Sequence, residues 1–241
     1  MMLRSIPSTG CGTIRGECGC RMYVEDYIKR MIAIAAAMIA RILGLKASGE
    51  YVQARAIIDQ LLELIVGLRA DLVRRMDDDS LLESLTHEGG MDTDRLGLLA
   101  ELFRHDGDVL NAQGKNIEAS ASYLRSLNFF VEAFLSGKDS GFPNPNEHIH
   151  YLLQRLDSQP LPAVSLYSLF HYYEETGAYA QGETTLADLL AATGLDAEVK
   201  IEYRDYYHRL LQKGDAELEA GGVKRTQIEA NLKQLNEENN E

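Results

Sequence analysis

Three cysteines offer the most obvious metal-binding chemistry in the chain. Cys11, Cys18 and Cys20 all lie within the first twenty residues, and two of them have Cys-x-Cys spacing. A structural zinc site takes four Cys or His ligands, and the nearest histidine in the sequence is His87. We therefore expect no metal ion here. We interpret residues 1–21 as a disordered N-terminal extension that precedes a natural start at Met22.

A run of three aspartates is the next candidate. Asp77, Asp78 and Asp79 resemble the paired aspartates with which isoprenoid synthases hold magnesium and diphosphate. That motif needs another acid a few residues later, where this chain has Leu81 and Leu82, and we find no second acidic motif. We interpret the three carboxylates as favourable charges at the start of a helix.

Two histidines lie close together in the sequence without the spacing that a shared metal ion requires. His148 and His150 are two positions apart on a predicted helix, which turns their side chains about 200° from each other. We interpret them as a solvated helix start. Because the chain also lacks the common hydrolase, metalloprotease and nucleotide-binding motifs, we expect no enzymatic activity, no catalytic residue and no cofactor.

The charge distribution limits the partners. The net charge is -13, but residues 1–76 contain 11 basic against 7 acidic residues, and the remainder contains 13 against 30. So acidic a surface repels nucleic acid and anionic lipid headgroups. We expect a protein or peptide partner, and a basic segment fits best. The other interpretation is that the charge only keeps the chain soluble.

The composition favours helices over strands. The chain has five prolines, no tryptophan and many unbranched helix-forming residues. Its longest apolar run, Met31 to Ala40, covers about half of a membrane crossing, so we expect a buried helix there. The N-terminus lacks the apolar core of a signal peptide, which predicts a cytoplasmic protein.

A pattern of small and large residues occurs three times along the chain. In each copy a glycine is followed after five residues by Ala or Gly, and then by large residues or Ser at intervals of four, three and one. A glycine that ends one helix and a small residue where the next helix crosses it describe a helical hairpin. The positions are Gly49, Ala54, Ile58, Leu61 and Leu62; Gly114, Ala119, Tyr123, Ser126 and Leu127; and Gly177, Gly182, Leu186, Leu189 and Leu190.

The second copy resembles the tetratricopeptide repeat. Gly107 and Leu110, with the five positions from Gly114 to Leu127, match the small and large positions of that family in register. The resemblance implies an all-α fold of antiparallel hairpins stacked as a short right-handed α-solenoid, in one domain over residues 22–241 with a sub-boundary at the loop 137–146. The whole chain is also similar to an uncharacterised family of bacterial helical proteins of unknown function.

The resemblance also implies a binding groove. In tetratricopeptide proteins the outward positions of each first helix line a concave surface that binds a peptide or a partner protein. The matching positions here are Leu43, Lys46, Glu101, Arg104, Asp108, Asn111, Tyr167, His171 and Glu174. We therefore expect a peptide-binding adaptor, and ordinary solvated helix positions are the alternative for all nine.

Other interpretations stay open. The predicted helix 24–45 is apolar on more than one face, which favours a homodimer through that helix if later repeats do not bury it. A partly exposed aromatic strip is indicated by six tyrosines that are too many to bury easily: Tyr167, Tyr172, Tyr173, Tyr203, Tyr206 and Tyr207. A polar last helix predicts a lid on the end of the stack. An enzyme acting on a small molecule or through a metal would need a closed pocket between hairpins.

Overall fold

The computed structural model describes residues 15–87, 90–137, 145–157, 159–194 and 196–238, which form twelve helices and one two-stranded ladder. The prediction of an all-α protein is confirmed, because each strand has only two residues. The elements are α1 (Arg15–Ala47), α2 (Tyr51–Val66), α3 (Ala70–Val73), α4 (Asp78–Ser84), β1 (Thr86–His87), β2 (Gly90–Met91), α5 (Thr93–Ala112), α6 (Asn116–Ser136), α7 (Pro145–Leu156), α8 (Ala163–Thr176), α9 (Tyr179–Ala192), α10 (Ala197–Leu211), α11 (Asp215–Ala220) and α12 (Arg225–Glu238).

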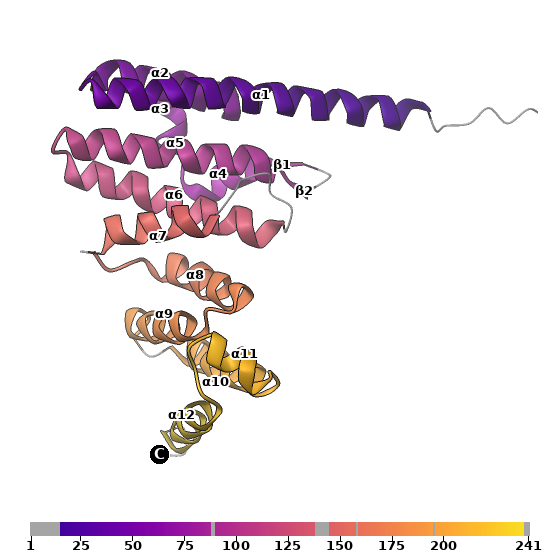
Figure 1. The fold of residues 1–241 in the computed structure, drawn as a ribbon, viewed down its shortest axis with the longest axis vertical. Helices are drawn as coiled ribbons and strands as arrows, with labels where there is room; N and C mark the ends of the chain where they lie inside the picture. The colour runs from indigo at the N-terminus through magenta and orange to yellow at the C-terminus, as the bar shows by residue number, and fades with distance from the viewer. Residues whose placement is uncertain (1–14, 88–89, 138–144, 158, 195, 239–241) are drawn as a thin grey trace, which may run out of the picture.

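The helices follow one another along the long axis of the molecule (Figure 1). Helices α1 and α2 form one end and pack on α5, which pairs with α6. Next come α7 and the pair α8 and α9, and helices α10 to α12 form the other end. The N-terminal part of α1 extends beyond the helices below it. No helix in the described part of the chain is both long and apolar enough to cross a membrane.

The three predicted hairpin turns share one backbone geometry. In each turn the glycine has a left-handed conformation, and the next residue donates its N–H to the carbonyl five positions earlier. The φ angles of Gly49, Gly114 and Gly177 are 76°, 75° and 74°. The hydrogen bonds join Glu50 to Leu45 (2.8 Å), Lys115 to Leu110 (2.9 Å) and Ala178 to Tyr173 (2.9 Å). This bond pattern satisfies a carbonyl that the helix end leaves free, and it favours glycine at the left-handed position.

The small residue five positions later lies between paired helices in all three copies. Ala54 and Ala119 are 0% and 1% exposed. Gly182 is also buried, and a Cβ there would lie 2.9 Å from the Tyr206 hydroxyl oxygen. The repeated spacing therefore predicted three real hairpins.

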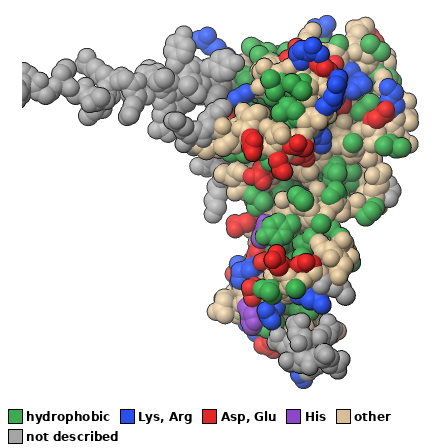
Figure 2. All heavy atoms as spheres, turned by 180° about the vertical axis from the view of Figure 1, so that it is seen from behind, with side chains coloured by type: hydrophobic (Ala, Val, Ile, Leu, Met, Phe, Trp, Pro, Cys, Tyr) green, Lys and Arg blue, Asp and Glu red, His purple; other side chains and the backbone are tan. Residues whose placement is uncertain are grey.

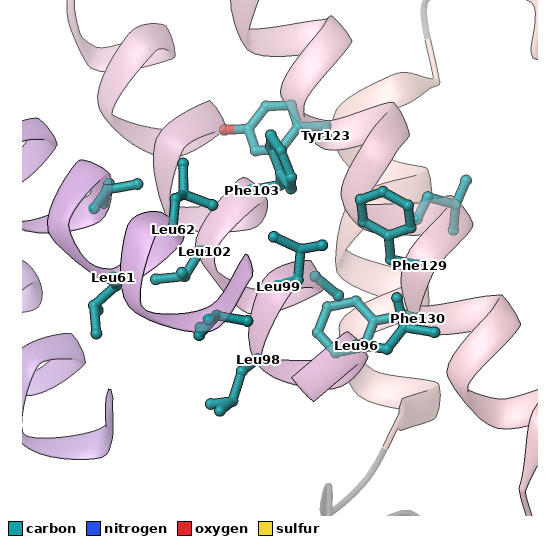
Figure 3. Packing of buried hydrophobic residues seen from close by; sticks show 14 of the residues in the cluster. Leu61, Leu62, Leu96, Leu98, Leu99, Leu102, Phe103, Tyr123, Phe129 and Phe130 are labelled. Carbon is teal, nitrogen blue, oxygen red and sulfur yellow. The ribbon is translucent and has the colours of Figure 1, made fainter. Parts of the chain in front are cut away.

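The buried hydrophobic residues form two clusters. The first extends from α1 to α8 and includes the leucines and phenylalanines of α2, α5 and α6 (Figure 3). The second extends from α8 to α12 and contains Tyr206 and Tyr207. Helix α8 contributes to both clusters, and α7 belongs to the first, so the division between them does not fall at the loop 137–146. The reason is that Ile149, Leu152 and Leu156 of α7 pack into the first cluster.

The start of α1 corrects one prediction. The sequence predicts a disordered extension up to residue 21, but residues 15–21 are helical and continuous with the rest of α1. Extending an existing helix adds one hydrogen bond for each residue that is ordered, so it costs far less than starting a new helix. Cys11 lies outside the described residues, and Cys18 and Cys20 lie on the helical backbone of α1.

Candidate functional site

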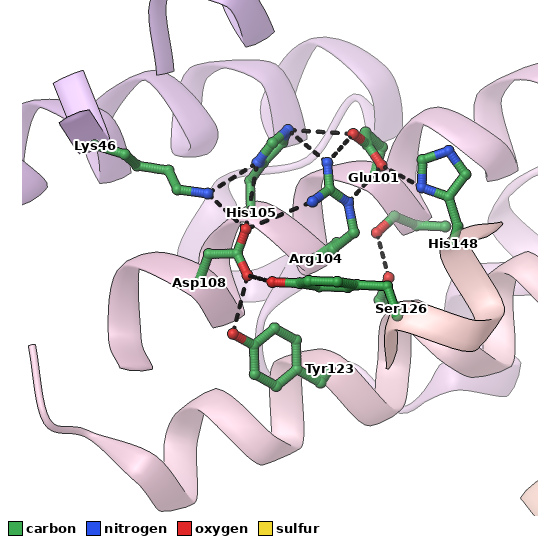
Figure 4. A network of polar contacts seen from close by, with 10 residues as sticks. Lys46, Glu101, Arg104, His105, Asp108, Tyr123, Ser126 and His148 are labelled. Carbon is green, nitrogen blue, oxygen red and sulfur yellow. Dashed lines mark hydrogen bonds and ion pairs between the residues drawn. The ribbon is translucent and has the colours of Figure 1, made fainter. Parts of the chain in front are cut away.

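Helix α5 contributes a line of polar residues to the interior of the helix stack. Glu101, Arg104, His105 and Asp108 are spaced three, four and seven positions apart, which places them on one face of the helix. Side chains from α1, α6 and α7 approach this face (Figure 4). We call the resulting set of contacts the α5 network.

Asp108 is the most heavily bonded member of the α5 network. Lys46, in the last turn of α1, donates to Asp108 Oδ2 over 2.5 Å. Tyr123 of α6 and Tyr151 of α7 donate their hydroxyls to Asp108 Oδ1 over 3.0 Å and 2.5 Å. Arg104 Nη1 lies 3.5 Å from Asp108 Oδ2. One carboxylate thus connects four helices.

Glu101 forms the other end of the α5 network. The guanidinium of Arg104 donates to both of its carboxylate oxygens, with Nε 2.9 Å from Oε2. His148 of α7 places its Nδ1 3.4 Å from Glu101 Oε2 and stacks on Phe130, with ring centroids 4.7 Å apart. His148 is thus a half-buried contact of α5, which corrects its interpretation as part of a solvated helix start.

His105 lies between the two carboxylates and is completely buried. Its Nε2 is 3.2 Å from Glu101 Oε1, and its Nδ1 is 3.5 Å from Lys46 Nζ. A carboxylate accepts hydrogen bonds and an ammonium group donates them. A neutral imidazole with its proton on Nε2 satisfies these two neighbours, because Nε2–H donates to Glu101 and Nδ1 accepts from Lys46. Arg104 Nη2, which also lies 3.2 Å from Nε2, donates to Glu101 instead.

Burial and ion pairing set the pKa values of these groups. Burial lowers the pKa of His105 from 6.5, and the nearby charges of Arg104 and Lys46 add to this effect, while Glu101 opposes it. Burial would raise the pKa of Glu101, but Arg104 and His105 outweigh it and the pKa is lowered. Burial would likewise raise the pKa of Asp108, but Lys46 and Tyr151 lower it. At neutral pH both carboxylates are charged and the imidazole is neutral.

A second buried carboxylate lies on another side of α5. Asp106 is 1% exposed and accepts hydrogen bonds from three side chains. Arg74 donates to it over 2.6 Å and 3.2 Å, Arg55 over 3.0 Å and Ser122 over 3.1 Å. Arg74 also donates to Asp59 over 2.7 Å. These bonds tie α2 and the residue after α3 to α5 and α6.

The charges of the α5 network balance one another. Lys46 and Arg104 carry two positive charges, Glu101 and Asp108 carry two negative charges, and His105 is neutral. Each charged group already has a partner of opposite sign. A ligand that bound any of these groups would have to break an existing ion pair. The arrangement is therefore suited to holding four helices together, and it leaves no charged group of the network free to act as a nucleophile or base.

The structure places the nine predicted groove residues in several environments. Lys46, Glu101, Arg104 and Asp108 come together in the α5 network. Leu43 and Asn111 are exposed on α1 and α5. Tyr167 is exposed and lies against the half-buried His171, with ring centroids 4.5 Å apart. Glu174 accepts from Arg209 of α10 over 2.6 Å and 2.9 Å.

Sequence reasoning did not find several members of the buried networks. The most important are His105, Asp106, Tyr123 in its hydrogen-bonding role, Tyr151 and His148. The spacing of His105 from Glu101, at i and i+4, was a usable signal. The two tyrosines carried no such signal, because their contacts with Asp108 cross 15 and 43 residues of sequence.

The other candidate motifs have local roles. Asp77 caps α4 by accepting from the Ser80 N–H over 2.7 Å, and Asp78 accepts from Arg125 over 2.7 Å. This agrees with their interpretation as carboxylates at a helix start. His150 is exposed and lies beside Gln154. In the described part of the chain no group of three Cys, His, Asp or Glu side chains is placed to hold a metal ion.

Comparison with known proteins gives the family but no activity. The model of a family of unknown function, DUF6483, matches residues 22–240. The chain belongs to this family. The match agrees with the predicted likeness to an uncharacterised family. No curated protein and no solved structure matches the chain.

Proposed function

We propose that this DUF6483 protein is a non-enzymatic adaptor, built from tetratricopeptide-like hairpins, that binds a segment of a partner protein. Support for the repeat architecture comes from the three turns, whose glycine φ angles agree within 2°. Support for binding comes from a groove in the C-terminal half. The groove differs from the surface implied by the tetratricopeptide resemblance, because four of those nine side chains are bonded to one another in the interior.

The groove lies between the end of α7, the start of α8 and the end of α9. It encloses about 540 Å³. Leu156 and Leu166, which are 4% and 6% exposed, line it together with the half-buried Leu153 and Leu161. Leu161 packs against both hydrophobic clusters, so the groove marks the place where they meet. Its apolar lining suits the side chains of a peptide.

Two carboxylates lie among the residues that line this groove. Asp157 follows α7 and Asp188 lies on α9, and both are exposed. Neither forms an ion pair within the part of the chain that the structure describes. An apolar surface beside two free acids complements a segment in which Leu, Ile or Phe is flanked by Lys or Arg. This combination is the observation that carries the proposal.

A larger hollow near α10 and α11 fits a peptide less well. It encloses about 870 Å³, but its charged residues are mostly bonded to one another. Arg209 pairs with Glu174, and Lys213 pairs with Glu217, which also accepts from the Tyr179 hydroxyl. A ligand would have to compete with these contacts.

A displayed library of random peptides, selected against the full-length protein, tests the proposal. We expect enriched peptides to combine large apolar residues with Lys or Arg. Isothermal titration of one such peptide should then show at least tenfold weaker binding to a variant carrying Asp157→Lys and Asp188→Lys. The control is Asp205→Lys, which changes an equally exposed carboxylate on α10.

Other outcomes of the binding experiment would contradict or refine the proposal. Equal binding to the wild type and to the double variant would show that the groove is not the site. A library that yields no peptide above background would reject the adaptor function itself. Binding that weakens as salt increases in the wild type, but not in the double variant, would assign the electrostatic part of the affinity to these two acids.

A further inference from the structure

Between residues 33 and 44 the outer face of α1 is exposed and mostly apolar, with Arg41 at its edge. Ala33, Ala37, Ala40 and Gly44 form its centre, and Ile34 lies at one edge with half of its surface exposed. From residue 30 to residue 47 the helix has no acidic residue. Helices α1 and α2 both pack on α5, so this face points away from the rest of the stack (Figure 1). At this end of the molecule the space-filling view shows hydrophobic side chains interspersed with Lys and Arg (Figure 2).

The two ends of the molecule differ in the polarity of the surface that they expose to water. A stack of helical hairpins needs a polar outer face on its terminal unit, since no further unit covers it. The polar helix α12 provides this at the C-terminal end, with exposed Glu229 and Lys233. At the N-terminal end, Leu43 on α1 and Val52 on α2 are 50% and 80% exposed. Among the residues that the structure describes, nothing covers the apolar surface of the N-terminal hairpin.

The spacing of the small residues along α1 indicates which molecule packs on this face. The central positions 33, 37, 40 and 44 are separated by four, three and four residues, and this order is the same in both directions. A face of this kind is complementary to a second copy of itself that runs antiparallel. We propose that two chains associate through this face, with α1 of one chain antiparallel to α1 of the other and a two-fold axis between Met38 and Ile39.

In this register small residues face each other along the centre of the interface. Ala37 is level with Ala40 of the second copy, and Ala33 is level with Gly44 of the second copy. Small residues allow two helices to approach closely, so backbone and Cβ atoms pack directly. Leu43, near the edge of the face, then lies beside the small residues of the facing helix, because Ala33 and Ala36 lie at nearly the same level. Large side chains thus meet small ones.

The basic residues of α1 also favour the antiparallel register. Arg41 is exposed, and a parallel pair would place it directly beside Arg41 of the second copy. In the antiparallel register the two residues are five positions apart along the interface, about 7.5 Å at 1.5 Å per residue. An axis at residue 42, which also pairs small residues, would leave only two positions, or about 3 Å, between them. Like charges repel more strongly at the shorter distance.

An anionic membrane is the other surface that a basic, apolar helix face could contact. Helices that lie on membranes insert large side chains such as Trp, Phe and Leu. The centre of this face has only alanine and glycine, which bury little area in lipid but pack well against another helix. We therefore assign the face to a second copy.

Light scattering after gel filtration tests the association. We expect the full-length chain to have twice the mass of one 26.9 kDa chain. Ala37→Glu places two acids at the centre of the interface and should raise the dissociation constant at least about 100-fold, because they would be buried without partners. Ala187→Glu, at an exposed position of α9, is the matched control and should leave the dimer intact.

Disulfide trapping tests the orientation. Cys11, Cys18 and Cys20 are first replaced by serine, and the variants Ala33→Cys and Gly44→Cys are then prepared separately. Oxidation should cross-link the mixture of the two variants but neither variant alone. In the antiparallel register two copies of residue 33 are 11 positions apart, about 16 Å, which is beyond the reach of a disulfide.

Three results would overturn the inference. The first is a monomer at every concentration tested, and the second is a dimer that Ala37→Glu does not weaken. The third is cross-linking of Ala33→Cys with itself, which would show a parallel pair. A monomer that sediments with vesicles of anionic lipid, and loses this binding in the Ala37→Glu variant, would assign the face to membranes instead.

Discussion

The N-terminal part of the molecule, α1 to α7, and the C-terminal part, α8 to α12, satisfy buried polar groups by different means. The N-terminal part relies mainly on ion pairs. Asp106 and Asp108 are each bonded to basic side chains from other helices, and two tyrosine hydroxyls add to these bonds at Asp108. The C-terminal part uses tyrosine hydroxyls. Tyr206 donates to the Tyr179 carbonyl over 2.9 Å, and Tyr207 donates to Glu183 over 2.5 Å.

The difference shows that one hairpin design can be stabilised in two ways. The turns of the two parts have the same geometry, but their stability should respond differently to charge, pH and steric change. Removing one member of a buried ion pair leaves the other charge unpaired, whereas a tyrosine hydroxyl can be removed without leaving a charge alone. The following four predictions test this contrast, from the largest expected effect to the smallest.

The largest loss should follow removal of the Asp106 carboxylate. Asp106→Ala leaves Arg55 without its ion-pair partner and leaves Arg74 paired only with Asp59. We expect the free energy of unfolding to fall by about 4 kcal/mol in urea titrations followed by circular dichroism. Asp205→Ala removes an exposed carboxylate and should change it by less than about 0.5 kcal/mol. A loss below about 1 kcal/mol for Asp106→Ala would mean that the ion pairs do not stabilise this part.

A steric change should destabilise the C-terminal part without any change of charge. A Cβ at Gly221 would lie 2.1 Å from Tyr179 Cδ2 and 2.6 Å from the Gly177 carbonyl oxygen. Gly221→Ala should therefore cost about 3 kcal/mol. Gly214→Ala, whose Cβ would meet no atom within 4 Å, is the control. Hydrogen exchange measured by mass spectrometry should show faster exchange in α8 to α12 and little change in α5 and α6.

Loss of a single tyrosine hydroxyl should have a smaller effect. Tyr207 is 1% exposed, and its hydroxyl contacts both Glu183 and Asn231. Tyr207→Phe removes these contacts, but Glu183 keeps its bond from Asn231, which measures 2.7 Å. We expect a loss of about 1.5 kcal/mol. The exposed Tyr167→Phe should have almost no effect, and equal losses in the two variants would contradict the role of the buried hydroxyl.

Mild acid should weaken the N-terminal part through its histidines. The pKa values of His105 and His148 are lowered from 6.5 in the folded chain, and burial is the largest cause. The unfolded chain therefore takes up these protons at a higher pH than the folded chain does. Stability should fall as the pH decreases below about 6.5. His105→Gln should make the free energy of unfolding less dependent on pH between 7 and 5.

The exposed His208→Gln is the control for the pH experiment, and its pH dependence should match that of the wild type. A second decrease should follow at lower pH. The pKa of Glu101 is lowered from 4.5, so its contribution is present above that pH and is lost as the pH falls further. An unchanged pH dependence in His105→Gln would show that the buried imidazole does not control the response.

The sequence predicted the helical hairpins well but the polar contacts only in part. The resemblance to the tetratricopeptide repeat placed Lys46, Glu101, Arg104 and Asp108 on one predicted surface, because the register of that repeat assigns outward positions to each first helix. It did not predict that these four side chains bind one another in the interior. It also missed His105, whose partners come from its own helix and from α1.

Local sequence by itself determined where the chain turns. Each turn depends on the backbone preference of a single glycine, at 49, 114 or 177, and on the short hydrogen bond that follows it. Tertiary structure alone decided which polar groups are buried, which are charged and which meet. Lys46 and Asp108 are 62 residues apart, and their ion pair depends on how two separate helices pack and on the exclusion of water around them, which no local preference specifies.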